Sequence, residues 1–175
     1  QALKIWEKII SFGKEFGLMP YGTETMHLLR AEKGYIIVGQ DTDGSITPLD
    51  LGLDWMIGKS KKDFLGKRSL IRSDTVRKDR KQLVGILPTN KNEKLEEGQH
   101  IILDKEIKTP TPMLGHITSC YQSPTLGHNF ALAVIKNGQS LIGTKAFAST
   151  PELKTIEVEI VEPIFYDKEN TKLAS

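Results

Sequence analysis

The spacing of apolar and polar residues along the chain changes near residue 78. Before that point, apolar residues recur at helical intervals or form short runs between polar turns. After it, short apolar stretches alternate with turns that contain Gly, Pro or Asn, which is typical of an antiparallel barrel or sandwich. We therefore predict an α+β chain, with an α/β segment over residues 1–78 and an all-β module over 79–175.

The first segment carries two helical patterns. Apolar residues within 3–16 follow a period near 3.6, and Gly17 stands where a left-handed C-cap is expected. A shorter helix is predicted over 24–29, with Thr23 as its N-cap. After these helices we expect a buried strand over 35–39, a helical turn over 48–53, a short strand over 54–57 and a helix over 67–78.

The second segment reads as a series of short strands. Each candidate is a run of β-branched, aromatic or other apolar residues that is bounded by a polar turn. The predicted strands cover 83–87, 99–103, 113–119, 130–135, 141–142 and 155–161.

Composition limits the class of protein and its partners. The chain has 175 residues and a net charge of +2, so bulk charge does not indicate a nucleic-acid partner. Cys120 is the only cysteine, which excludes a disulfide within the chain, argues against a cysteine-based metal site and favours a cytoplasmic setting. No apolar run approaches the roughly 18 residues that a membrane helix needs, and no signal peptide is visible. Because the chain also lacks an initiator Met, we expect a fragment of a longer protein.

Glu32 is the acidic residue that stands out in the first segment. It follows an apolar pair and precedes Gly34, so it is expected at the end of a helix beside a strand. A carboxylate held there can accept hydrogen bonds from a planar N–C–N edge, such as that of a pterin or a guanidine. The alternative is an ordinary surface ion pair with Arg30 or Lys33, and from the residues alone this alternative is favoured.

Other polar groups carry weaker signals. Asp41 and Asp43 resemble part of a calcium loop, but the twelfth position counted from Asp41 is Gly52 and not Glu, so a solvated turn is favoured. The four histidines share no metal-ligand spacing, and no Ser/His/Asp arrangement is suggested. Three lysines within 59–62 can meet an anionic ligand tail, although a solvated charge run is the more frequent explanation of such a cluster.

Several motifs, in order, resemble the folate-binding aminomethyltransferase family, which includes the T-protein of the glycine cleavage system. They are LRAEKG at 29–34, GQD at 39–41, TP at 47–48, GLDW at 52–55, DFLGK at 63–67, GHITS at 115–119, SPTLG at 123–127 and ALA at 131–133. Within the family, the sequence most resembles the C-terminal part of the alpha subunit of heterotetrameric sarcosine oxidases. PYGTE at 20–24, the run 30–43 and PIFYD at 163–167 carry that narrower likeness.

This resemblance implies a fold and an activity. The fold is the C-terminal half of the family's folate-binding α/β domain, followed by its small antiparallel β-barrel. The complete enzyme oxidises sarcosine with flavin, and the folate-binding domain passes the resulting imine-level carbon to tetrahydrofolate. The products are 5,10-methylenetetrahydrofolate, glycine and hydrogen peroxide. FAD, FMN and NAD belong to the complete enzyme, since no dinucleotide-binding glycine motif occurs here. The implied partners are folate, the sarcosine-derived imine and the other oxidase subunits.

The resemblance also implies site residues. Glu32 corresponds to the family's pterin-binding Glu, Lys61 to an Arg that meets the folate glutamate tail, and Tyr166 to a position that can face folate. The loop 41–44 is then expected to form a wall of the folate pocket. No catalytic residue is assigned, because the acidic residue central to the transfer lies in the upstream half of the family's domain. We therefore expect this chain alone to be inactive.

Two further functions stay open at this stage. One is a plain aminomethyltransferase or a folate-dependent demethylase on the same fold. The other, from a different class, is a non-catalytic folate-binding module that serves assembly or the maintenance of RNA modification.

Overall fold

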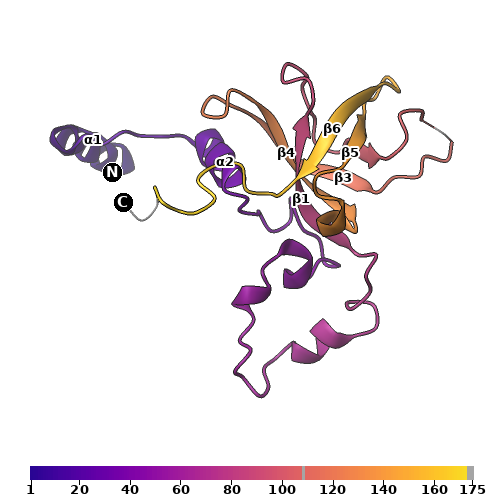
Figure 1. Cartoon of the computed structure of the whole chain (residues 1–175). Coiled ribbons are helices and arrows are strands. Elements are labelled where there is room, and N and C mark those ends of the chain that lie inside the picture. Colours follow the sequence, from indigo (N-terminus) through magenta and orange to yellow (C-terminus); the bar gives the residue numbers. More distant parts are fainter. Residues whose placement is uncertain (108, 173–175) are drawn as a thin grey trace.

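A closed β-barrel forms the body of the protein, and helices and 3-10 turns precede it (Figure 1). The computed structural model describes residues 1–107 and 109–172. Within these residues, the strands pair in the antiparallel order β1-β4-β3-β2-β5-β6, and β6 closes the barrel by pairing with β1. This confirms the predicted fold class and decides for a barrel over a sandwich.

The strands agree with the sequence pattern except between residues 138 and 149. They span Lys81–Pro88 (β1), His100–Ile102 (β2), Gly115–Ser123 (β3), His128–Lys136 (β4), Lys145–Ser149 (β5) and Thr155–Val161 (β6). The strand predicted over 141–142 is wrong, because Gly138–Leu141 forms a 3-10 turn, η5. β5 was not predicted, since two of its five residues are alanines, which are weak strand formers, and both are buried in the barrel interior.

Both faces of β4 are buried, which explains the unbroken apolar run in its sequence. One face joins the barrel interior with residues from the other strands. The opposite face carries Phe130, Leu132 and Val134, which cluster with Ala31 near the end of helix α2 (Thr23–Glu32). The barrel therefore has its own core, and a second, smaller core holds the end of that helix on its outer wall.

The first two predicted helices are present. α1 spans Ala2–Gly13 and continues into a 3-10 turn, η1, at Lys14–Phe16, which ends at Gly17 in the left-handed conformation (φ 68°). α2 spans Thr23–Glu32 and is longer than expected. Gly22, and not Thr23, takes the N-cap position of α2, so the predicted cap is wrong by one residue.

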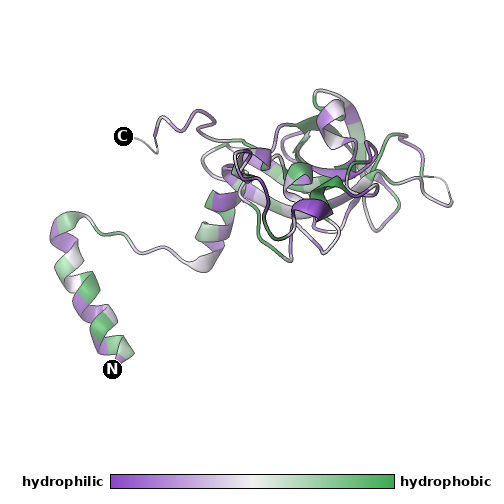
Figure 2. Ribbon diagram, turned by 90° about the horizontal axis from the view of Figure 1, so that it is seen from below, coloured by the Kyte–Doolittle hydropathy of each residue, from purple (hydrophilic) through white to green (hydrophobic). Residues whose placement is uncertain are grey.

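Helix α1 stands away from the barrel (Figures 1 and 2), and most of its large apolar side chains are exposed. Trp6 is 53% exposed and Phe12 is 72% exposed. An amphipathic helix of a globular protein ordinarily packs such a stripe onto a core. Among the residues that the structure describes, nothing covers it.

The segment between α2 and the barrel differs most from expectation. Residues 35–39 form no strand, only an isolated bridge between Val38 and Thr42, because no described segment pairs with them. The expected strand over 54–57 is a 3-10 turn, η3 (Asp54–Met56), and the turn expected over 48–53 is confirmed as η2 (Pro48–Leu51). The helix expected over 67–78 is reduced to a 3-10 turn, η4 (Lys67–Ile71), since its many like charges leave little apolar surface to pack.

Candidate functional site

The end of α2 docks on the barrel through Arg30. Its Nη1 donates to Asp41 Oδ2 at 2.5 Å, and its Nη2 donates to Ser119 Oγ at 2.8 Å and to Tyr121 Oη at 3.2 Å. The Arg30 side chain is 10% exposed and that of Asp41 is fully buried. This ion pair therefore joins the helix, the loop after it and strand β3.

Both carboxylate oxygens of Asp41 accept hydrogen bonds. Besides Arg30, its carboxylate accepts hydrogen bonds from the Ile37 backbone N–H at 2.8 Å, from the Thr118 hydroxyl at 2.6 Å and from the Ser119 hydroxyl at 2.5 Å. A buried carboxylate needs such donors to offset its loss of water. The contacts place Asp41 in the helix–barrel junction.

Residues 41–43 of the loop 41–44 line a polar cavity of about 130 Å³ against the barrel. Lys81 and His116 contribute to its lining. Burial lowers the pKa of His116, and the neighbouring Lys81 lowers it further. Glu32 does not line this cavity, so the structure does not bring the loop and Glu32 to one space. A role for the loop in a folate pocket stays a prediction.

Glu32 is the last residue of α2, and it is 2% exposed. Its Oε1 accepts a hydrogen bond from Ser123 Oγ at 2.6 Å. Its backbone carbonyl accepts hydrogen bonds from the backbone N–H groups of Phe165 at 2.9 Å and Tyr166 at 3.0 Å. Two parts of the second half of the chain therefore meet at Glu32: the β3–β4 turn and the segment after β6.

The favoured surface ion pair of Glu32 with Arg30 or Lys33 is wrong. Arg30 pairs with Asp41, and Lys33 Nζ donates to the Asp167 carbonyl at 2.5 Å and to Asn170 Oδ1 at 2.8 Å. These partners lie elsewhere in the chain, where local sequence spacing cannot reveal them.

Gly34 completes the docking of this region. Its backbone is left-handed (φ 71°), and a Cβ at this position would lie 2.4 Å from the Pro163 carbonyl oxygen. Only glycine permits both features, so the segment after β6 can pass directly over the end of α2. Residues 30–34, apart from Ala31 in the small outer core, thus each make a polar or close backbone contact with residues beyond 34.

The other two predicted site residues have different positions. Tyr166 lies beside Glu32 through the backbone contact described above, and its hydroxyl accepts a hydrogen bond from Lys172 Nζ at 2.5 Å. Lys61 is exposed and lines a largely apolar hollow of about 540 Å³ within the segment 48–70. That segment projects from the barrel on a different side from α2 (Figure 1). The structure therefore brings Tyr166 to Glu32 and leaves Lys61 apart.

Two family models match the chain. The GCVT N-terminal domain matches residues 1–61, and the glycine cleavage T-protein C-terminal barrel domain matches residues 81–167. The chain belongs to the glycine cleavage T-protein family. The family motif at 29–34 is thus the stretch that docks α2 on the barrel.

Individual relatives agree with this assignment. The chain is 47% identical over 172 residues to the sarcosine oxidase subunit alpha of Corynebacterium sp. (strain P-1), covering 97% of this chain and 18% of that protein. It is 34% identical over 170 residues to the sarcosine oxidase subunit alpha of Rhizobium meliloti (strain 1021), covering 97% of this chain and 17% of that protein. It is 32% identical over 168 residues to the aminomethyltransferase of Clostridium botulinum (strain Kyoto / Type A2), covering 95% of this chain and 43% of that protein. The chain therefore spans less than a fifth of the alpha subunits it matches.

A solved structure supports the fold. The crystal structure of glycine cleavage system aminomethyltransferase T from Bartonella henselae superposes with a TM-score of 0.67 and 21% sequence identity. The match covers 81% of this chain and 38% of that one. Over the matched part, the fold is thus that of a T-protein.

Sequence reasoning missed a second buried ion pair in this T-protein family member. Arg80, just before β1, donates from Nε to Asp50 Oδ1 at 2.9 Å and from Nη2 to Asp50 Oδ2 at 2.6 Å. Asp50 also accepts hydrogen bonds from the backbone and hydroxyl of Thr47, both at 2.8 Å, which completes a capping box on η2. The sequence carries a signal for the capping box, Thr47-Pro-Leu-Asp50 with Pro at the first position of the turn, but none for the contact of Asp50 with Arg80.

These contacts shift the pKa of Asp50. Burial by itself would raise it, but the hydrogen bonds from Arg80 and Thr47 outweigh burial and lower the pKa below its ordinary value. The hydrogen bonds that Arg80 donates to Asp50, together with the charge of Asp50, raise the pKa of Arg80. The pair is therefore charged at neutral pH and fastens η2 to the start of the barrel.

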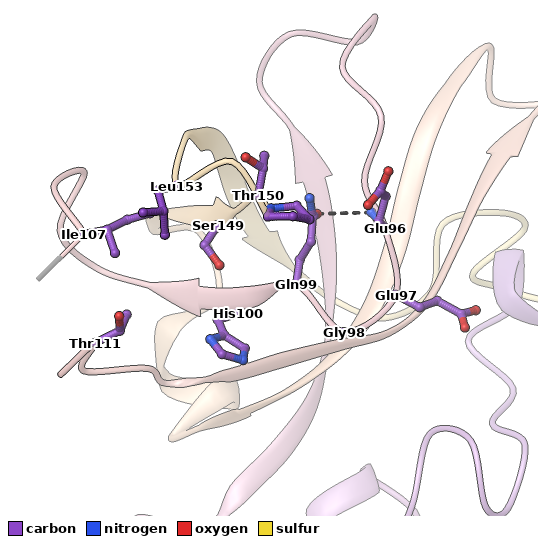
Figure 3. Close-up of a pocket in the computed structure, with 11 residues that line it drawn as sticks. Glu96, Glu97, Gly98, Gln99, His100, Ile107, Thr111, Ser149, Thr150 and Leu153 are labelled. Atoms are coloured by element: carbon purple, nitrogen blue, oxygen red, sulfur yellow. Dashed lines mark hydrogen bonds between the residues drawn. The ribbon is translucent and has the colours of Figure 1, made fainter. Parts of the chain in front are cut away.

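A pocket of about 430 Å³ lies elsewhere on the barrel, between the start of β2 and the β5–β6 turn (Figure 3). Gln99 Oε1 accepts a hydrogen bond from the Glu96 backbone N–H at 3.1 Å, while the Glu97 side chain points away from the cavity (Figure 3). None of the predicted site residues lines this pocket. It is thus separate from the site at Glu32.

Cys120 is not prepared for nucleophilic chemistry. Burial raises the pKa of its thiol to about 11, and its Sγ donates to the Leu95 carbonyl at 3.1 Å.

Within residues 1–107 and 109–172, no group of three His, Cys, Asp or Glu side chains is arranged to hold a metal ion. In the same residues, no helix combines the length and apolar character needed to cross a membrane.

Removing the charge of Asp41 tests the helix–barrel junction. Asp41→Asn is expected to lower the free energy of unfolding by about 3 kcal/mol, because Arg30 then stays buried without its countercharge. Asp54→Asn is the control, since Asp54 is exposed and lies 3.8 Å from Lys59, and it should cost less than about 1 kcal/mol. Urea denaturation measures both, and equal losses for the two variants would contradict the role given to Asp41.

The Asp50–Arg80 pair should make stability depend on acid pH. Because the pKa of Asp50 is lower in the folded protein than in the unfolded chain, its contribution is complete above about pH 4 and is lost as the pH falls through the folded pKa. Asp50→Asn should be less stable than wild type at pH 7 and should converge toward it at pH 2–3. Urea denaturation across this range measures the difference, and a constant gap would contradict the assignment.

Proposed function

We propose that this chain is the folate-binding portion of a sarcosine oxidase alpha subunit. In the whole enzyme it would pass the methyl-derived carbon of sarcosine to tetrahydrofolate, with 5,10-methylenetetrahydrofolate, glycine and hydrogen peroxide as products. The observation that carries the proposal is the 47% identity to a sarcosine oxidase subunit alpha across 97% of this chain. FAD, FMN and NAD would act in the complete enzyme, outside this chain.

The Glu32 carboxylate fits the edge of a pterin. A pterin presents neighbouring N–H groups on one edge, and a carboxylate can accept from two of them at once. Ser123 occupies one lone pair of Oε1, and no described residue donates to Oε2. The carboxylate thus keeps acceptor capacity that the N–H groups of a ring edge would use.

The residues of this chain would bind and orient folate. When bound, tetrahydrofolate supplies the amine nitrogens that accept the one-carbon unit. Glu32 would fix the orientation of the pterin ring, and Tyr166 would border it from the segment after β6. Lys61 would meet the anionic glutamate tail as a point charge, because it lacks the planar fork of an arginine. We assign no proton transfer to this chain.

The remaining expectations extend the same proposal. Residues 1–78 would form the C-terminal piece of the folate-binding domain, and residues 79–175 the barrel domain. The partners would be folate, the sarcosine-derived imine and the other oxidase subunits, in the cytoplasm. An aminomethyltransferase is the second candidate, because the Clostridium botulinum enzyme matches 95% of the chain, but its 32% identity is lower.

Glu32→Gln in the full-length subunit, assembled with its partners, tests the pterin contact. The variant should bind tetrahydrofolate about tenfold more weakly, since an amide offers one acceptor oxygen and no charge to the ring N–H groups. Oxidation of sarcosine without folate should stay near the wild-type rate. Titration calorimetry under anaerobic conditions measures the affinity.

The matched control for this variant is Glu24→Gln. Glu24 lies in the first turn of α2 and is exposed, so its replacement should leave folate affinity unchanged. Unchanged affinity in Glu32→Gln, with the protein correctly folded, would remove the basis of the pterin assignment.

The 175-residue chain alone should show no turnover with sarcosine and tetrahydrofolate. It contains no assigned catalytic residue, and it spans 18% of the matching alpha subunit. Mass spectrometry for 5,10-methylenetetrahydrofolate measures this, with the full-length enzyme as the positive control. Product formed by the chain alone would refute the expectation.

A further inference from the structure

Ser123 lies where the barrel touches the Glu32 carboxylate. It is the last residue of β3, it begins the turn that leads into β4, and it is 1% exposed. Its hydroxyl donates to Glu32 Oε1 at 2.6 Å, and the Leu126 backbone N–H donates to the same hydroxyl oxygen at 2.9 Å. A residue of the barrel therefore holds an acidic group of the helix that is far away in the sequence.

The direction of this hydroxyl is set by the turn. A serine hydroxyl has one proton to donate, and its oxygen accepts through lone pairs. Because the Leu126 N–H occupies a lone pair, the proton is free to point at the carboxylate oxygen. The turn is itself fixed, since the Gly127 N–H donates to the Ser123 carbonyl at 2.9 Å and Ser123 pairs with His128 across the hairpin.

The Glu32 carboxylate needs such a partner for two reasons. The terminal torsion of a Glu side chain is broad, so the plane of an unpaired carboxylate is poorly defined. The carboxylate also lies at the C-terminal end of α2, where the helix dipole disfavours negative charge. Among the described residues, Ser123 is the one that donates a hydrogen bond to this carboxylate. It both fixes the plane and stabilises the charge.

We propose that Ser123 is a positioning residue of the folate site, which holds the Glu32 carboxylate in the orientation that receives the pterin ring. This inference rests on the pterin contact proposed above. After accepting from Ser123, Oε1 keeps one lone pair and Oε2 keeps both, so two ring N–H groups can still be accepted. A two-point contact of this kind depends on the angle of the carboxylate plane, which makes a fixed second partner important.

A double-mutant cycle in the full-length, assembled protein tests this role, with tetrahydrofolate as the probe. Ser123→Ala should weaken folate binding about tenfold, the equivalent of losing one hydrogen bond to a charged group. In the Glu32→Gln background, the same change should weaken binding less than twofold, because the carboxylate that Ser123 orients is already absent. A purely structural role would give the same loss in both backgrounds.

Two further variants separate positioning from general stability. Ser123→Cys keeps the shape of the side chain but replaces the hydroxyl with a weaker donor, so we expect an intermediate loss of folate affinity, about threefold. If Ser123→Ala does not fold, Ser123→Cys replaces it in the double-mutant cycle. Ser119→Ala is the matched control, since Ser119 is also a buried serine of β3 but contacts Asp41 and not Glu32. It should lower the unfolding temperature and leave folate affinity within twofold of wild type.

The outcomes distinguish this inference from the function on which it rests. If Glu32→Gln leaves folate affinity unchanged, the proposed pterin contact itself fails. If Glu32→Gln weakens binding while both Ser123 variants bind as wild type, the positioning role is overturned alone. An equal loss in Ser119→Ala also overturns it, because the effect would then follow from a weakened barrel.

Discussion

The buried ion pair between Arg30 and Asp41 fixes how the first part of the chain meets the barrel. Removing two charges from water costs several kcal/mol, and the pair persists only where other donors and acceptors complete its shell. Here the hydroxyls of Thr118 and Ser119 and the Ile37 N–H supply them for Asp41. Since these groups come from the loop and from β3, the pair holds the end of α2 against the barrel, while Glu32 itself is held by Ser123, Phe165 and Tyr166.

The family motif at 29–34 therefore has a physical explanation that is independent of any ligand. Arg30 makes the ion pair, Ala31 fills the outer core, Lys33 holds the segment after β6, and Gly34 lets that segment pass. Glu32 differs from these neighbours, because Ser123 alone, among described residues, hydrogen-bonds its carboxylate. Residues 30–34 thus include one acidic side chain with spare acceptor capacity, which is the property that a pterin contact requires.

Local patterns predicted what local forces decide. The apolar period of α1 and the unbroken run in β4 were sufficient to identify both elements. The strand expected over 35–39 failed because a strand needs a neighbour to pair with, and its own residues cannot supply one. The partners of Arg30 and Glu32 were equally invisible, since Ser119 and Ser123 are 89 and 91 residues away in the chain. The residues alone singled out Glu32 but favoured a surface ion pair for it, and only the family resemblance favoured a pterin contact.

The two parts of the chain differ in how well they bury their own apolar surface. The barrel closes on itself and fills its interior with its own side chains. Helix α1 exposes its stripe, and Trp55, Met56 and Leu65 are exposed in the segment that carries Lys61. Groups attached to the barrel are therefore held by a complete core, whereas Lys61 lies on a segment with little packing of its own. In the proposed site, this chain would therefore hold Glu32 on a complete core, whereas the position of Lys61 would depend on what covers that exposed surface.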